Sequence, residues 1–138
     1  MGEALTAAQG FYDAFATAEV SNWIGLFSDD CRTVTPAGAF DKAGHEALGK
    51  AFHDAFPDAH MEVARTLEAG DEVYITGRFK GTHTGDLNSP DGTIPASGRS
   101  IDFAYVDYFR VVDGKIVAEE VIWDQMTLLG QIGALPPS

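Results

Sequence analysis

The chain has 138 residues, of which 21 are acidic and nine are basic, giving a formal net charge of −12. This length fits one domain, residues 1–138, with a single hydrophobic core, and it is too short for two such cores. With this excess of acidic residues, the chain lacks the basic surface that binding to nucleic acids or anionic lipids requires. We therefore expect neither a nucleic-acid nor a membrane partner.

Apolar residues make up 45% of the chain, which indicates a folded protein. No stretch approaches the roughly 20 apolar residues that span a bilayer. Residues 1–4 lack the basic and apolar start of a secretory signal. The single cysteine, Cys31, has no internal disulfide partner, and we interpret it as a small buried apolar residue. These features predict a cytoplasmic location.

Helical spacing dominates the first part of the chain. Thr6 and Gln9 fit a capping box, in which two side chains satisfy free amides at a helix start. Apolar residues then recur at helical intervals as far as Phe15. A second, short helix is expected from about Ser21, and a third over residues 45–56.

Strand-like alternation replaces the helical spacing later in the chain. Residues 31–35 predict a short early strand that ends at Pro36. The later strands are expected, in order, over residues 60–68, 71–83, 99–112 and 115–123. Turn residues between neighbours predict antiparallel hairpins, and a last helix over 125–132 follows. The long connection over residues 84–98 can be a lid or an ordinary exposed loop.

Helices followed by strands and one final helix predict an α+β fold, with helices on one face of a curved antiparallel sheet. Side-chain alternation separates the two faces of the strand over 99–112. The more apolar set is assigned to the concave face, and its members are Ile101, Phe103, Tyr105, Asp107 and Phe109. The same alternation puts His83 on the apolar face of the preceding strand. It places Trp123 and Asp124 on opposite faces of the last strand.

Three segments of the chain resemble the SnoaL-like polyketide cyclases and the related ester cyclases. They are Gly81–Gly85, Phe109–Ile116, and Trp123–Asp124 with the following Leu128–Gly133. The resemblance implies an NTF2-like cone, in which N-terminal helices cover the concave face of a curved antiparallel sheet and a short C-terminal helix follows. It also implies a homodimer that forms through the sheet face.

The resemblance implies catalytic roles as well. The aspartate of the cyclases that matches Asp124 is regarded as the acid/base of an intramolecular aldol closure. His83 can polarise a carbonyl or orient Asp124, and Asp107 can hold a proton or donate to an oxyanion. The expected substrate is a small neutral apolar, aromatic or polyketide-like molecule. No cofactor and no metal is expected, because an acidic substrate carbon suits a carboxylate base. The expected substrate-binding residues are Trp123, Tyr105, Phe103, His60, Phe79 and Tyr12.

Two other enzyme groups with this fold match less well. Asp107 resembles the oxyanion-hole aspartate of ketosteroid isomerases, but their base position holds Thr35, and Phe11, next to Tyr12, falls at their oxyanion tyrosine. Limonene-epoxide hydrolases use an Asp-Arg-Asp set with the arginine two residues before one aspartate. Here Arg99 precedes Asp102 by three residues. Both activities are therefore disfavoured.

Simpler interpretations stay open beside these roles. Asp124 can serve only as the N-cap of the last helix, His83 can be a histidine at a loop edge, and Asp107 can form a structural ion pair with Arg78 or Arg110. For the whole protein, a binding module without turnover and an interaction domain remain alternatives to the enzyme.

Overall fold

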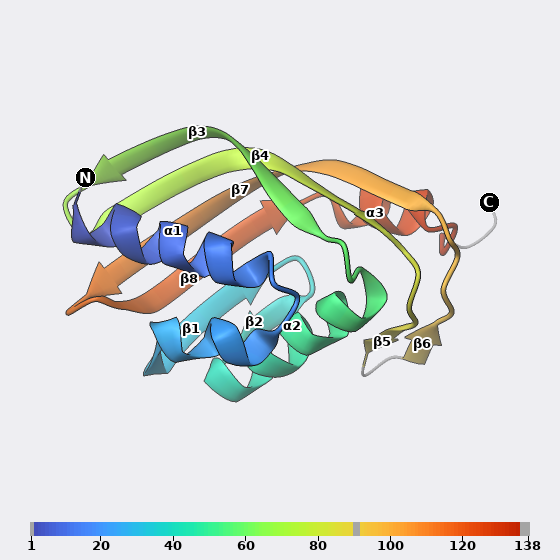
Figure 1. Cartoon of the computed structure of the whole chain (residues 1–138), viewed down its shortest axis with the longest axis horizontal. Helices are drawn as coiled ribbons and strands as arrows, with labels where there is room; N and C mark the ends of the chain where they lie inside the picture. The colour runs from blue at the N-terminus through green and yellow to red at the C-terminus, as the bar shows by residue number, and fades with distance from the viewer. Residues whose placement is uncertain (1, 90–91, 136–138) are drawn as a thin grey trace.

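The computed structural model describes residues 2–89 and 92–135 (Figure 1). The helices are α1 (Glu3–Phe15), η1 (Val20–Asn22), η2 (Ile24–Leu26), α2 (Lys42–Ala55) and α3 (Gln125–Gln131). The strands are β1 (Phe27–Thr35), β2 (Gly38–Phe40), β3 (His60–Ala69), β4 (Glu72–Thr82), β5 (Leu87–Ser89), β6 (Gly92–Ile94), β7 (Ser100–Val112) and β8 (Lys115–Trp123). The predicted α+β class is confirmed.

Six of the described strands form one sheet in the order β2-β1-β8-β7-β4-β3. The predicted antiparallel pairing holds for β3 with β4, β4 with β7 and β7 with β8. The sheet is nevertheless mixed, because β1 runs parallel to β8. This pairing joins segments about 90 residues apart in the sequence, which alternation within each strand cannot indicate.

Helices α1 and α2 lie on one side of the curved sheet, and β5 and β6 form a small separate hairpin near the end of α2 (Figure 1). The side chains of β7 alternate between buried and exposed along nearly its whole length, which confirms the predicted concave set. The core packs aromatic rings from α1, the 3-10 turns and the sheet. Phe11 makes edge-on contacts with Trp23, Phe27 and Phe109 at 5.1 to 5.8 Å between centroids.

Two helix starts differ from the sequence predictions. Helix α1 begins at Glu3, and the Thr6 hydroxyl donates to the carbonyl of Gly2, so the predicted capping box is wrong. Glu68 of β3 accepts hydrogen bonds from the Gly2 and Leu5 amides at 2.9 Å, and a carboxylate from a distant strand thus takes the capping role. The helix expected near Ser21 consists of the two short 3-10 turns.

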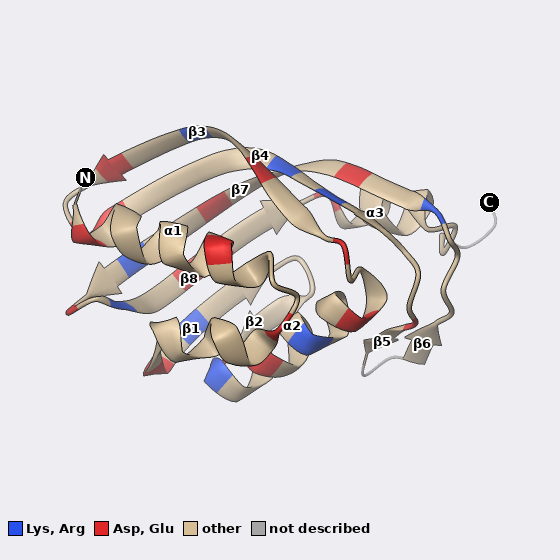
Figure 2. Ribbon diagram, in the orientation of Figure 1, with Lys and Arg blue, Asp and Glu red and all other residues tan. Residues whose placement is uncertain are grey.

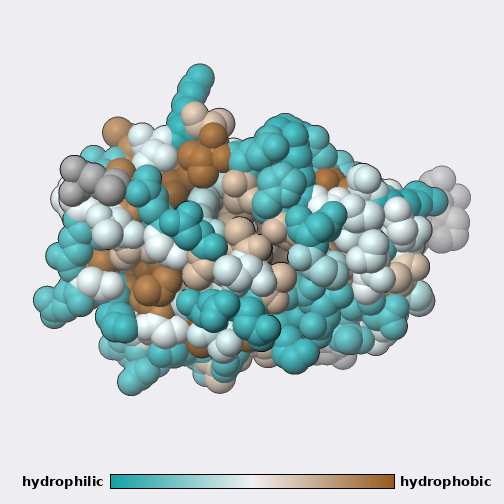
Figure 3. Space-filling model, in the orientation of Figure 1, coloured by the Kyte–Doolittle hydropathy of each residue, from teal (hydrophilic) through white to brown (hydrophobic). Residues whose placement is uncertain are grey.

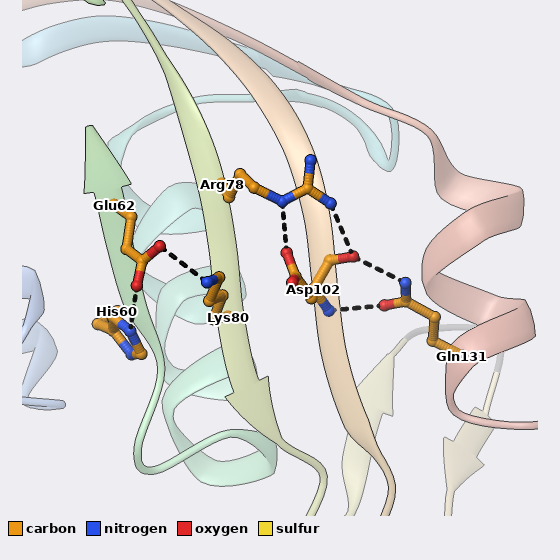
Figure 4. Close-up of polar contacts among 6 residues, drawn as sticks. All are labelled: His60, Glu62, Arg78, Lys80, Asp102 and Gln131. Atoms are coloured by element: carbon orange, nitrogen blue, oxygen red, sulfur yellow. Dashed lines mark hydrogen bonds and ion pairs between the residues drawn. The ribbon is translucent and has the colours of Figure 1, made fainter. Parts of the chain in front are cut away.

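Polar contacts on the convex face connect β3, β4, β7 and α3 (Figure 4). Arg78 binds Asp102 at 2.6 Å, and Lys80 binds Glu62 at 2.8 Å. The Gln131 side chain accepts from the Asp102 amide and donates to the Asp102 carbonyl, both at 2.8 Å. Because β8 ends opposite Tyr105, Gln131 takes the place of a strand partner there and holds α3 against β7.

Acidic residues outnumber basic ones on α1, β1, β3, β7 and β8, whereas β4 carries more basic than acidic residues (Figure 2). Within the described parts of the chain, no helix has the length and hydrophobicity that a bilayer crossing requires.

Candidate active site

A small apolar cavity lies between the concave face of the sheet and helices α1 and α2. Its volume is about 80 Å³. Figure 3 shows the surface hollowed near its centre, where α1, α2 and β3 approach one another in Figure 1. The lining residues are Phe11, Phe15, Trp23, Thr35, His45, Leu48, Gly49, Phe52, Met61, Phe79, Phe103, Tyr105, Asp107, Glu119, Val121 and Trp123. Aromatic side chains thus surround a few polar groups, an arrangement typical of small-molecule sites.

Two carboxyl groups lie side by side in the wall of this cavity. Asp107 of β7 is opposite Val121 of β8, and Glu119 is opposite Phe109, so the two acids are diagonal neighbours on the concave face. Asp107 is 1% exposed and Glu119 is 4% exposed. Two acids buried so close together cannot both carry a charge without a large cost, so the pair retains a proton near neutral pH.

Burial shifts both acids towards their protonated forms. It raises the pKa of Asp107 to about 7, although hydrogen bonds with Glu119 and Tyr12 act in the opposite direction. Burial, and then the negative charge of Asp107, raise the pKa of Glu119 well above its usual range. At neutral pH the two carboxyl groups therefore share a proton as a pair, which supplies one acid and one base in contact.

Tyrosine side chains approach the pair from two elements. Tyr12 of α1 donates a hydrogen bond of 2.9 Å from its hydroxyl to Asp107 Oδ2. Burial raises the pKa of Tyr12, so it stays a donor. The α1 hydroxyl that reaches Asp107 thus belongs to Tyr12, the neighbour of the Phe11 that the sequence comparison matched to this position. Tyr105 lies 6.3 Å from the Tyr12 ring, and burial raises its pKa to about 12.

Several polar atoms at the cavity are left without partners. Within the described residues, the Tyr105 hydroxyl, Asp107 Oδ1 and Glu119 Oε1 are buried and make no hydrogen bond. Leaving a buried polar atom unsatisfied costs about 1–3 kcal/mol, so such atoms mark places for a water or a ligand group. All three belong to cavity-lining residues.

His45 of α2 is a site residue that the sequence analysis missed. It is 7% exposed, its Nδ1 lies 3.0 Å from the Thr33 hydroxyl, and its Nε2 lies 3.6 Å from Glu119 Oε1. Burial lowers the pKa of His45 to about 4, so the ring is neutral at physiological pH. The sequence signal was the inward-facing row of α2, in which His45, Gly49 and His53 follow one another at intervals of four.

Five of the residues predicted from the sequence line the cavity: Asp107, Tyr105, Phe103, Phe79 and Trp123. Tyr12 joins them through its bond to Asp107. The alternative ion pairs for Asp107 are wrong, because Arg78 binds Asp102 and Arg110 binds Asp71 on the convex side.

The other three predicted residues lie elsewhere. Asp124 is exposed, is absent from the cavity wall, and accepts a hydrogen bond from the Thr127 amide at 3.2 Å as the N-cap of α3. Strand alternation explains this position, because Trp123 faces the cavity and the next side chain faces away. His60 is exposed, and its Nε2 lies 3.5 Å from Glu62. The acid/base role expected for Asp124 remains a prediction that no contact of this side chain supports.

His83 is fully buried but does not line the cavity. Its ring lies 5.3 Å from that of Phe56, and its Nδ1 accepts from the Ser97 amide at 3.1 Å. It therefore anchors the connection over 84–98. The described residues of this connection contribute nothing to the cavity wall, and residues 90 and 91 lie outside the described part.

An open groove between α1 and β3 adjoins the cavity. Its volume is about 500 Å³, and it is lined by Gln9, Tyr12, Asp13, Phe15, Ala16, His60, Met61 and Val63. Phe15 and Met61 belong to the walls of both spaces. These two side chains therefore separate the inner cavity from the groove. No cluster of three or more potential metal ligands occurs among the residues with described positions.

A family model for SnoaL-like polyketide cyclases matches residues 6–132 of the chain. A search of the curated proteins gives no significant match.

Solved structures share the fold over nearly the whole chain. A putative polyketide cyclase from Bacillus cereus is 28% identical, with a TM-score of 0.77 and coverage of 97% of this chain and 83% of that one. IdmH, a putative polyketide cyclase from Streptomyces antibioticus, is 24% identical, with a TM-score of 0.77 and coverage of 96% and 99%. A putative SnoaL-like polyketide cyclase from Jannaschia sp. is 19% identical, with a TM-score of 0.82 and coverage of 98% and 94%.

Proposed function

Because the chain belongs to the SnoaL-like polyketide cyclase family, we propose that it is a cyclase-type enzyme that closes a ring by an intramolecular aldol reaction. The observation that carries this proposal is the buried pair of Asp107 and Glu119 in the wall of an apolar cavity. The pair offers a base and an acid at the same pH, which is what an aldol closure requires.

The proposed reaction has two proton transfers with the substrate and one between Asp107 and Glu119. The Asp107 carboxylate removes a proton from a substrate carbon between two carbonyl groups, and the resulting carbanion attacks a second carbonyl carbon. The alkoxide that forms takes the proton of Glu119. One proton transfer from Asp107 to Glu119, across their contact, then restores both groups. A carbon between two carbonyls is acidic enough for a carboxylate with a raised pKa, so acid/base catalysis by the pair suffices.

The cavity suggests the class of substrate. Its aromatic walls favour flat, apolar rings, and a net charge of −12 disfavours strongly anionic substrates. A volume of about 80 Å³ holds about one ring, so a longer substrate has to extend into the groove between α1 and β3. Phe15 and Met61 stand at the junction and have to turn aside for this substrate to pass.

A binding module without turnover is the second candidate function. The exposed position of Asp124, the residue expected to be the acid/base, favours it. In that case the cavity holds an apolar ligand and the buried acids provide hydrogen bonds only.

Exchange of carbon-bound hydrogen tests the proposal. The probe is benzoylacetone in D₂O, which carries one aromatic ring and one methylene between two carbonyls, with NMR measuring deuterium uptake. We expect the protein to accelerate deuterium uptake. The Asp107→Asn variant should reduce this acceleration at least 100-fold, and the Asp124→Asn variant should retain it. Binding of the probe without acceleration establishes the module instead, and loss of exchange in Asp124→Asn alone refutes the assignment to Asp107.

Assembly forms a separate part of the proposal. Leu67, Tyr74, Val106 and Ile122 project from the convex side of the sheet and are 66%, 48%, 40% and 57% exposed. Exposed apolar residues grouped on one sheet face support a homodimer that forms through this face.

A further inference from the structure

The inner cavity and the groove between α1 and β3 share two wall residues, Phe15 and Met61, and we call the junction between these side chains the passage. The two spaces have volumes of about 80 Å³ and about 500 Å³. Tyr12 lines the groove and donates a hydrogen bond to Asp107, which lines the cavity. A substrate that reaches from the cavity into the groove therefore runs past the buried acid pair and through the passage.

Phe15 forms the more rigid side of the passage. It is the last residue of α1 and is 8% exposed. The rings of Phe11, Trp23, His53 and Phe79 have their centroids 5.8, 6.0, 4.5 and 6.2 Å from that of Phe15. In a closely packed interior, a ring with four ring neighbours can turn only slightly without displacing one of them.

Met61 forms the more adaptable side of the passage. It lies on β3, the edge strand of the sheet, so its only neighbouring strand is β4, where it is opposite Phe79. Its side chain is only partly buried. A methionine side chain is unbranched and has three rotatable bonds, so it fits irregular spaces and changes conformation at low cost. Of the two shared residues, Met61 is therefore the one that can widen the passage.

The Tyr105 hydroxyl lies on the side of the cavity that is directed towards the groove. A Cβ at Gly77 would lie 2.9 Å from this hydroxyl, and Gly77 is opposite Val63, which lines the groove. Within the described residues, the hydroxyl is buried and makes no hydrogen bond. A buried donor of this kind is stabilised by an acceptor from a ligand. It therefore favours a substrate that has a carbonyl group close to the passage.

We propose that Met61 is a specificity-determining residue, which controls whether a substrate can carry a ring on both sides of its reacting carbon. In the observed conformation Met61 separates the cavity from the groove, so the cavity accepts one ring. When Met61 turns towards the groove, a second ring reaches the groove while the reacting carbon stays beside Asp107. This inference rests on the proposed function, but ligand binding tests it without turnover.

Two diketones form a matched pair of probes. Benzoylacetone carries a phenyl ring on one side of its methylene and a methyl group on the other, whereas dibenzoylmethane carries a phenyl ring on both sides. Isothermal titration calorimetry gives a Kd for each probe. We expect Met61→Ala to lower the ratio of the dibenzoylmethane Kd to the benzoylacetone Kd by about tenfold, because the alanine variant no longer has to populate an open conformation.

Leu48→Ala and Val63→Ala are the matched controls. Leu48 of α2 lines the cavity and not the groove, whereas Val63, two residues beyond Met61 on β3, lines the groove and not the cavity. Each control removes an aliphatic side chain without opening the passage, so neither should lower the ratio by more than about twofold. An unchanged ratio in a folded Met61→Ala protein, or an equal decrease in a control, overturns the proposal.

The native protein provides a test that does not depend on the folding of a variant. The chain has three methionines, so NMR with carbon-13-labelled methionine methyl groups can follow Met61 separately. We expect saturating dibenzoylmethane to shift the Met61 methyl resonance more than benzoylacetone does, and to leave that of Met126, which is 62% exposed, unchanged. A Met61 resonance that does not respond to bound dibenzoylmethane refutes the proposal, and so does a failure of dibenzoylmethane to bind both the native protein and Met61→Ala.

The two proposals fail in different ways. The expected change in the Kd ratio without any acceleration of deuterium uptake refutes the enzyme function and leaves the role of Met61 intact. Accelerated deuterium uptake from benzoylacetone with an unchanged Kd ratio in Met61→Ala refutes the role of Met61 and leaves the enzyme function intact.

Discussion

The pH dependence of stability gives a direct test of how strongly Asp107 is perturbed. Folding raises its pKa from 3.8 to about 7, so the folded state holds this proton more tightly than the unfolded state. The associated stabilisation is complete below pH 3.8 and is lost as the pH rises through 7. A difference of about three pH units corresponds to at most about 4 kcal/mol.

Asp107→Asn removes this titration while nearly preserving shape. We expect the stability of the native protein relative to the variant to fall by up to about 4 kcal/mol between pH 4 and pH 8. The assay is urea unfolding at intervals across this range, with the free energy of unfolding compared at each pH. His45, whose pKa is lowered, contributes with the opposite sign and is present in both proteins. The charge of Asp107 contributes to the raised pKa of Glu119, so the difference reports on the Asp107–Glu119 pair.

Asp102→Asn is the matched control, because Asp102 lies on the same strand with half of its side chain exposed on the opposite face. It reports the effect of the substitution itself on β7. A native-minus-variant difference for Asp107→Asn that stays constant within about 1 kcal/mol from pH 4 to pH 8 refutes the perturbed acid.

Three further predictions follow from packing. Gly49→Ala should destabilise the protein by about 1–3 kcal/mol in urea unfolding, because the new methyl group displaces Trp23. Gly25→Ala is the control, because a Cβ at Gly25 has no neighbour within 4 Å, and equal effects of the two substitutions would contradict the close contact between Gly49 and Trp23. Ile122→Glu should convert a dimer into monomers in light scattering, whereas a native protein that is already monomeric rules out the sheet-face dimer. Gln131→Ala should cost about 1–2 kcal/mol and speed amide exchange in α3, and unchanged exchange there would show that other contacts hold the helix.

Local patterns in the sequence were sufficient for much of the fold. Alternation along β7 placed Phe103, Tyr105 and Asp107 on the concave face, because side chains of a strand point alternately to its buried and exposed faces. The same rule placed Trp123 and Asp124 on opposite faces. The helix starts and the parallel pairing of β1 with β8 depended on partners far along the chain, such as Glu68, and were not predicted.

The candidate site was predicted only in part, for the same reason. Tyr12 and Asp107 are 95 residues apart, and a helical period does not indicate which hydroxyl reaches which strand. Glu119 alternates with exposed residues like an ordinary strand carboxylate, so its burial becomes apparent only when β8 is paired with β7. His45 carries no motif, and its polar neighbours, Thr33 and Glu119, lie on two other elements.

The position of a bound diketone tests the central claim most directly. A crystal structure with benzoylacetone should place the methylene carbon within about 3.5 Å of Asp107 Oδ1, with the phenyl ring against the aromatic wall. A diketone that lies at Asp124, or that stays outside the cavity with Asp107 untouched, would contradict the account.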